Sequence, residues 1–390
     1  MKNTLLATVL VTILFGACKP NVNPNASPNA AKESQTSQTT TGIKPLVSEN
    51  AYYHLKGVVG DMPITMDLVK ARYENTLSCN GTYYYDKYQV PISLYGAVDG
   101  KLRLDEYHNI RDDKETTMFF EGELTDSGFI GTWSDGKKTY NVDLKNVIND
   151  EIVRFTQLYF DDSLPNIKKY NIEARKSSTS LSALFPMAST NAEVRAFLEK
   201  NILKGILTDS IMQLTNAKTP AQAFEYFRTD LRNEFDTLRN QIGQNDTAVV
   251  EFAMHYKSTN VNVVFNQNQR LTLCYDWSSF SGGAHGMYNY TYENYDLKNL
   301  KVLQISDIFK EGYAKTLNAE LEKSLRKLYN IKPKQRLTAV LFDNKIEHND
   351  NFILTEKAIV FCYNPYEIAS YADGVIYLSV QLDNLKTVLK

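Results

Sequence analysis

Short runs of alternating hydrophobic and polar residues constrain the first folded part of this chain most strongly. A period of two is typical of strands that bury one face, and the runs cover residues 52–59, 64–69, 81–88, 92–98, 102–107, 118–124, 129–133 and 140–144. Asp99-Gly100 and Asp135-Gly136 separate consecutive runs. Such pairs favour tight hairpins because both central residues of a type I′ turn need positive φ. We therefore predict an all-β sandwich or barrel over residues 48–148.

The period changes to three and four in three later stretches, which predicts amphipathic helices. The apolar stripes are Val194, Phe197, Leu198, Ile202, Ile206 and Leu207; Phe224, Phe227, Leu231, Phe235, Leu238 and Ile242; and Tyr313, Leu317, Leu321, Leu325 and Leu328. Thr219 before Pro220 is typical of a helix start, and Gly243 is a plausible end of the same helix.

Further strands are expected between and after these helices, at residues 151–160, 167–175, 248–256, 260–265, 359–363 and 375–382. Asp161, Asp162, Ser163 and Pro165 are expected to form the turn between the first two. Groups of strands separated by helices, without strict alternation of the two, favour an α+β domain with helices on one face of a mostly antiparallel sheet. We expect this domain to cover residues 150–390.

Residues 270–296 predict a strand, a small-residue loop and a second strand. Leu271, Leu273, Tyr275 and Trp277 share one face of the first strand, and Tyr288, Tyr290 and Tyr292 share a face of the second. Gly282 and Gly283 allow the loop a backbone with positive φ. His285 follows them, so we expect it at the tip of a tight turn.

This hairpin holds the candidate binding residues, namely Trp277, Gly282, Gly283, His285, Tyr288, Tyr290 and Tyr292. Tyrosine combines a large apolar ring with a polar tip, which suits a protein interface or a glycan surface as well as an ordinary sheet. His285 is open to a structural, a binding or a catalytic role, with Asp276, Ser278, Ser279 and Ser281 nearby. Sequence neighbours on one hairpin seldom converge into a triad, and we assign no catalytic residue.

The first 18 residues resemble the signal peptide of a bacterial lipoprotein. Lys2 precedes an apolar run over residues 5–15 that is too short to span a bilayer, and Gly16 and Ala17 precede Cys18 as in a lipobox. An ordinary signal peptide ending near a cysteine is the alternative. Residues 19–47 lack aromatic residues and predict a disordered tether. We expect an exported protein held through Cys18 on the periplasmic or surface side of a bacterial membrane.

Several classes of ligand are not expected. The formal net charge of -2 gives no basic footprint for nucleic acid, no glycine-rich phosphate loop indicates a nucleotide, and the scattered histidines indicate neither a metal nor another cofactor. Besides Cys18 the chain has Cys79, Cys274 and Cys362. Cys274 and Cys362 are a candidate disulfide between neighbouring strands, or all three are small buried hydrophobic residues.

Separated motifs in the last third of the chain resemble the extracytoplasmic domain of the RsiV and PdaC proteins, a bacterial envelope family of largely unknown function. They are Gly-Gly-Ala-His at residues 282–285, the Tyr-Asp at 295–296 before Asp-Ile-Phe at 307–309, Tyr-Glu-Ile-Ala at 366–369 and Tyr-Ala-x-Gly at 371–374. The resemblance implies the fold and a non-catalytic binding role at the envelope, for lysozyme-like muramidases or peptidoglycan. The alternative is an enzyme acting on cell-wall glycan, of the hydrolase or deacetylase type.

Overall fold

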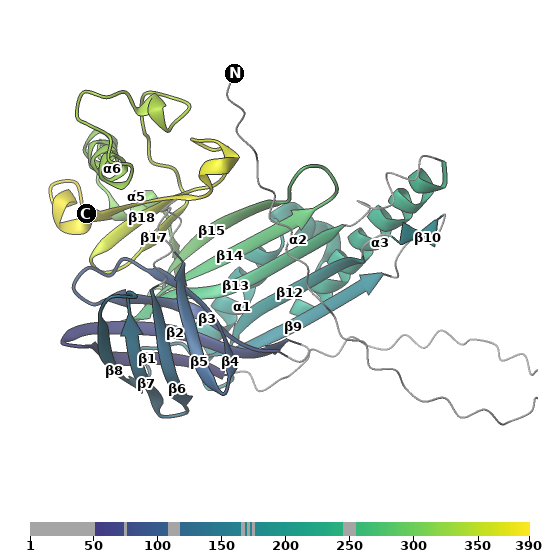
Figure 1. Ribbon diagram of the computed structural model, residues 1–390, viewed down its shortest axis with the longest axis horizontal. Helices are drawn as coiled ribbons and strands as arrows, with labels where there is room; N and C mark the ends of the chain where they lie inside the picture. The colour runs from purple at the N-terminus through teal and green to yellow at the C-terminus, as the bar shows by residue number, and fades with distance from the viewer. Residues whose placement is uncertain are drawn as a thin grey trace, which may run out of the picture. The chain divides into compact units, whose positions relative to one another are not determined.

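The structure is a computed structural model, shown in Figure 1, and it describes residues 51–73, 76–107, 118–164, 168–169, 172–173, 176–244 and 255–390. The expected signal peptide with Cys18 and the expected tether lie outside the described residues. Within the described part, no helix combines the length and the apolar character that crossing a membrane requires.

The first described strands form a closed antiparallel barrel, one of the two architectures predicted from the alternating runs. Its strands pair in sequence order and β1 also pairs with β8, which closes the barrel. The strands are β1 (Ala51–Val59), β2 (Met62–Tyr73), β3 (Thr76–Tyr85), β4 (Ile92–Asp99), β5 (Lys101–Tyr107), β6 (Phe119–Thr125), β7 (Gly128–Ser134) and β8 (Thr139–Asn146). Because side chains alternate between the two faces of each strand, Leu55, Phe120 and Phe129 point into the buried core of the barrel.

A six-stranded sheet in the order β16-β15-β14-β13-β12-β9 forms the centre of the α+β region. Its strands are β9 (Phe155–Leu164), β12 (Ser177–Pro186), β13 (Tyr256–Gln267), β14 (Arg270–Phe280), β15 (Met287–Asp296) and β16 (Lys301–Leu303). All neighbours are antiparallel except β12 and β13. Two short strands, β10 (Lys168–Lys169) and β11 (Ile172–Glu173), pair separately. The expected mostly antiparallel sheet is confirmed.

The turn predicted after residue 160 is wrong, because β9 continues through Asp161 and Asp162 to Leu164. These residues pair with β12, a strand that the sequence did not predict since its first half is rich in serine. The charge of Asp162 is stabilised within the strand because its carboxylate accepts a hydrogen bond from Arg228 Nε at 2.7 Å. Further along, β13 is one strand, and residues 248–254 of the expected preceding strand lie outside the described residues.

Helices α1 (Ala192–Ile206) and α3 (Pro220–Gln244) cover one face of the six-stranded sheet, with the short α2 (Asp209–Thr215) between them (Figure 1). The Asn191 side chain caps α1 by accepting from the backbone N–H groups of Glu193 and Val194. Thr219 Oγ1 accepts from the Gln222 N–H at the start of α3, as its sequence predicts. The predicted end at Gly243 lies inside α3, which is described up to Gln244.

A second, three-stranded sheet closes the chain in the order β17-β18-β19, with β17 (Phe352–Leu354), β18 (Ala358–Tyr363) and β19 (Ile376–Gln381). Helix α6 (Ala314–Leu328) follows the short α5 (Ile305–Ile308) and buries Leu317, Leu321 and Leu325 against this sheet. The connections carry three short 3₁₀ helices, η1 (Leu337–Ala339), η2 (Tyr371–Asp373) and η3 (Leu382–Leu385). The third predicted helical stripe is therefore confirmed.

A buried polar junction joins the barrel to the six-stranded sheet. Asn266 on β13 has no exposed surface, and its Nδ2 donates to Tyr52 Oη at 2.7 Å and to the Val153 carbonyl at 2.8 Å. Its Oδ1 accepts from the Val153 N–H at 3.2 Å. Tyr52 in turn donates to Asp67, which also bonds His54. The division into domains at 48–148 and 150–390 stays a prediction, with its boundary between β8 and β9.

Cys79, Cys274 and Cys362 are all buried free thiols. Cys79 lies in the barrel core, whereas Cys274 and Cys362 share a cluster between the two sheets. The last two lie on β14 and β18, which belong to different sheets, so the expectation of neighbouring strands is wrong and the proposed disulfide is not formed here. The alternative description as small buried hydrophobic residues fits their positions.

Replacing Asn266 with alanine should lower the free energy of unfolding by about 3 kcal/mol, because it leaves the buried N–H and carbonyl groups of Val153 without their partner and removes the bond to Tyr52. Urea denaturation followed by circular dichroism measures this. Asn141→Ala is the matched control, since Asn141 is exposed on β8 and should change the stability by less than about 0.5 kcal/mol. Equal stabilities of the two variants would contradict the junction.

Three thiols should resist modification in the native chain carrying Cys18→Ser and react only after unfolding. Burial raises the pKa of Cys79 to about 12, and burial also raises the pKa of Cys274 and Cys362, so the reactive thiolates stay scarce below these values. Titration with a thiol reagent at pH 8, with and without denaturant, measures the count. Fewer than three reactive thiols in denaturant without reductant would show a disulfide instead.

Candidate functional site

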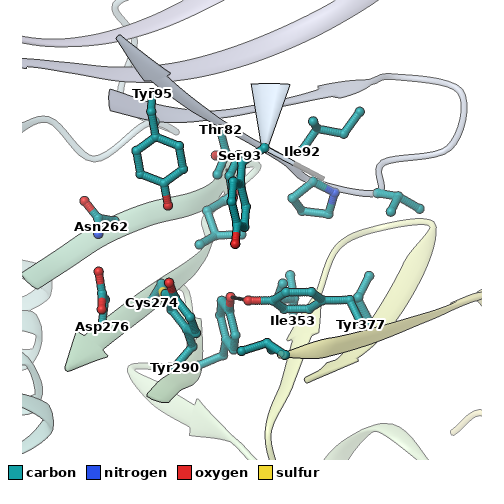
Figure 2. Close-up of a pocket in the computed structure, with 18 of the residues that line it drawn as sticks. Thr82, Ile92, Ser93, Tyr95, Asn262, Cys274, Asp276, Tyr290, Ile353 and Tyr377 are labelled. Carbon is teal, nitrogen blue, oxygen red and sulfur yellow. Dashed lines mark hydrogen bonds between the residues drawn. The ribbon is translucent and has the colours of Figure 1, made fainter. Parts of the chain in front are cut away.

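A cavity of about 500 Å³ lies where the barrel, the six-stranded sheet and the three-stranded sheet meet (Figure 2). The barrel contributes residues of β3 and β4, the six-stranded sheet contributes β13, β14 and β15, and the C-terminal region contributes β17 to β19 and the end of α6. This volume is in the range of about 300–1,000 Å³ that is usual for small-molecule sites. Residues separated by nearly 300 positions therefore share one site.

Six tyrosines line the cavity, namely Tyr95, Tyr107, Tyr290, Tyr292, Tyr329 and Tyr377. Tyr95 and Tyr107 meet edge to face with centroids 5.9 Å apart, and they are 47% and 56% exposed, so they stand at the opening. Deeper in the cavity, the hydroxyl groups of Tyr292 and Tyr377 lie 2.9 Å apart (Figure 2). The walls thus offer aromatic faces together with hydroxyl groups.

Asp276 is the single aspartate or glutamate among the described residues that line the cavity. Alternation along β14 places it on the face of Cys274, opposite Leu273 and Tyr275, which pack under the helices. Its Oδ2 accepts a hydrogen bond from Asn260 Nδ2 at 3.3 Å. Burial raises the pKa of Asp276, and the bond from Asn260 offsets part of that effect.

Two asparagines hold the edge of β15 that carries the cavity tyrosines. Asn351 accepts from the Tyr292 N–H at 2.9 Å and donates to the Tyr290 carbonyl at 2.8 Å. Asn364 accepts from the Tyr290 N–H at 2.8 Å and donates to the same carbonyl at 3.0 Å. These amides take the place of a neighbouring strand, so the backbone beneath both tyrosines is fixed and its edge is covered.

The structure divides the candidate binding residues of the hairpin among three places. Tyr290 and Tyr292 line the cavity. Trp277 is on the other face of β14 from its neighbour Asp276 and is 39% exposed. Gly282, Gly283 and His285 belong to the loop at the end of the hairpin, and the ring of Tyr288 meets both Tyr371 of this end and Tyr290 of the cavity. The predicted set is therefore not one surface.

The end of the hairpin is an aromatic cluster built on His285. Its ring stacks on Tyr371 with centroids 3.8 Å apart, and Nε2 lies 3.5 Å from Tyr366 Oη. Nδ1 lies 2.9 Å from the Gly286 carbonyl, the kind of contact expected of a structural histidine. Gly282 and Gly283 have φ values of 93° and 96°, as the loop requires. Both ring nitrogens of His285 thus lie beside groups other than Asp276, whose hydrogen bond is to Asn260.

The sequence pointed to Tyr290 and Tyr292 but missed Tyr95 and Asn262, which face the same cavity (Figure 2), and Asn260, which also lines it. Nothing local marks these residues, because strands far apart in the sequence bring them together. The alternation along β14 does predict that Asp276 lies on the face opposite Tyr275 and Trp277. The described residues contain no group of three or more His, Cys, Asp or Glu side chains that could hold a metal ion.

Comparison with known proteins adds a family and a fold. Residues 306–383 match the family described as "Protein of unknown function (DUF3298)", so the match includes the cavity wall from Tyr329 to Tyr377. Over 176 residues, 45% of this chain, the sequence is 27% identical to the peptidoglycan-N-acetylmuramic acid deacetylase PdaC of Bacillus subtilis strain 168. The chain spans about a third of that relative's length, 34%.

Two solved structures of the DUF3298 family are similar. One, from Bacteroides fragilis NCTC 9343, is 21% identical, with a TM-score of 0.55 over 62% of this chain and 96% of that chain. The other, from Pseudomonas aeruginosa PAO1, is 16% identical, with a TM-score of 0.45 and the same shares. The first likeness supports the fold of the α+β region. The C-terminal part of this chain carries a DUF3298 domain, and the function of that family is unknown.

Proposed function

We propose that this chain is a lipid-anchored protein of the bacterial cell envelope that binds a saccharide of the peptidoglycan glycan in the cavity, without catalysing a reaction. The observation that carries the proposal is the lining of six tyrosines beside amide and hydroxyl groups. The apolar faces of a sugar ring suit aromatic side chains, and its hydroxyl groups suit asparagine and serine. A wholly apolar ligand would displace water from Asp276 and Asn262 without replacing its hydrogen bonds.

The position of the acid groups favours binding over glycan hydrolysis. Most glycosidases need two carboxyl groups on either side of the scissile bond. Asp276 is the single carboxyl group among the described lining residues, and its bond to Asn260 lies on one wall. The similarity to PdaC, whose name places its action on peptidoglycan, supports the cell wall as the location.

A protein partner such as a muramidase is the second candidate, and the end of the hairpin is the observation that favours it. Tyr366 is 52% exposed and Met287 is 40% exposed beside the stacked rings of His285 and Tyr371. Exposed aromatic residues and methionine are enriched at protein interfaces. Tyr366 is not a lining residue of the cavity, so substitutions of Tyr366 and Tyr95 can distinguish the two candidates.

Tyr95→Ala should weaken binding of N-acetylglucosamine oligomers and of purified sacculi by about tenfold, because the loss of one aromatic face costs about 1.5 kcal/mol. Calorimetry with the oligomers and sedimentation with the sacculi measure this. Tyr88→Ala is the matched control, since Tyr88 is 51% exposed on the barrel but is not a lining residue.

Tyr366→Ala tests the second candidate in the same assays and in a pull-down with lysozyme. The cavity proposal expects it to bind glycan as the unchanged protein does. Loss of glycan binding in Tyr366→Ala with full binding in Tyr95→Ala would contradict the cavity and place the contact at the hairpin end.

The proposed anchor predicts that cells fed labelled palmitate incorporate the label into this protein, and that Cys18→Ser prevents it. The variant should also leave the membrane fraction, because residues 5–15 are too short to span a bilayer. An unlabelled protein whose Cys18→Ser form still fractionates with membranes would overturn this part of the proposal.

A further inference from the structure

The cavity carries an unbalanced charge. Asp276 is the single lining residue with a formal charge at neutral pH among the described residues, and no described lysine, arginine or histidine lines the same space. The other titratable lining groups are tyrosines and Cys274. Burial raises the pKa of Tyr95 to about 12, and it also raises the pKa of Tyr290 and of Cys274. The negative charge of Asp276 is the second largest cause of the raised pKa in all three groups. These groups are therefore neutral, and Asp276 sets the charge of the site.

The surroundings of Asp276 suit a cation. The carboxylate is half-buried, and within the described part of the chain it accepts a 3.3 Å hydrogen bond from Asn260. A carboxylate in this position loses hydration, and a single long hydrogen bond replaces little of it. A ligand of opposite charge would therefore bind strongly there. Asp276 and Asn262 lie together on one wall, with the Tyr95 ring across the space from them (Figure 2).

An ammonium group matches this arrangement better than an acetamide does. Its three N–H donors can meet the Asp276 carboxylate, the side-chain oxygen of Asn262 and the hydroxyl oxygens of Tyr95 and Tyr290. An N-acetyl group is neutral, has one N–H donor, and would place a carbonyl or methyl group near a carboxylate. A free amino sugar should therefore fit this site better than its N-acetylated form.

We propose that the ligand of the cavity is a hexosamine with a free, protonated amino group, which Asp276 binds as its counter-ion. The inference rests on the proposed function, since it takes the cavity as a saccharide site. It adds a preference for glycan from which acetyl groups have been removed. An enzyme that hydrolyses N-acetyl groups of glycan must then act before this protein binds.

Calorimetry on the full chain, purified in detergent, tests this with two trisaccharides at pH 6.5, one of glucosamine and one of N-acetylglucosamine. We expect the glucosamine trisaccharide to bind at least tenfold more tightly. Asp276→Asn keeps the size of the side chain and should abolish this preference, lowering affinity for glucosamine while leaving affinity for N-acetylglucosamine within about twofold. Asp143→Asn is the control, because it removes the same charge from an exposed site on β8.

The outcomes separate the two proposals. Equal affinity for the two trisaccharides in the unchanged protein would overturn the inference and leave the proposed function standing. No binding of either would overturn both. A preference for glucosamine that persists in Asp276→Asn, or that is lost equally in Asp143→Asn, would show that Asp276 is not the counter-ion. The affinities of the unchanged protein for the two trisaccharides test the preference for a free amino group by themselves. A folding defect in Asp276→Asn would therefore not prevent that test.

Discussion

Asn266 ties the barrel to the six-stranded sheet, and the cavity exists because these two parts of the chain meet. The amide is fully buried and bonds both Tyr52 on β1 and the backbone of Val153 in the connecting segment. Asp67 and His54 extend the same buried network. The bond between Asn266 and Tyr52 links the two parts directly, and a buried polar group that loses its partner costs about 1–3 kcal/mol. The two walls of the site are therefore fixed relative to each other.

The remaining wall depends on the amides that cover β15. Asn351 and Asn364 connect the loops of the three-stranded sheet to the backbone of Tyr290 and Tyr292. Hydrogen bonds thus hold the strands of these walls in place, so little ordering remains to be done when a ligand enters. Such preorganisation favours affinity because binding loses less conformational entropy. It suits a protein that recognises a small ligand.

The elements of the fold could largely be predicted from the sequence, because each follows from a local pattern. Asp99-Gly100 and Asp135-Gly136 sit at the turns β4–β5 and β7–β8, and the three apolar stripes became α1, α3 and α6. Strand β12 was not predicted, since its first half is rich in serine and the apolar residues that follow do not alternate with polar ones. Closure into a barrel rather than a sandwich depends on the pairing of β1 with β8, which no local pattern shows.

The candidate site could be predicted only in part, for the same reason. Tyr290 and Tyr292 stand out as an alternating row, whereas Tyr95 and Asn262 are unremarkable until the barrel packs on the sheet. His285 attracted notice because of its glycine loop, yet its ring contacts lie at the hairpin end with Tyr371 and Tyr366. Local composition thus identified an exposed turn, and long-range packing made the cavity.

A crystal structure of the chain with a bound glucosamine oligosaccharide tests the central claim most directly. We expect density for a sugar between Tyr95 and the wall formed by Asp276 and Tyr290, with its amino nitrogen within hydrogen-bond distance of the Asp276 carboxylate. Sugar density at the hairpin end beside Tyr366, with an empty cavity, would contradict it.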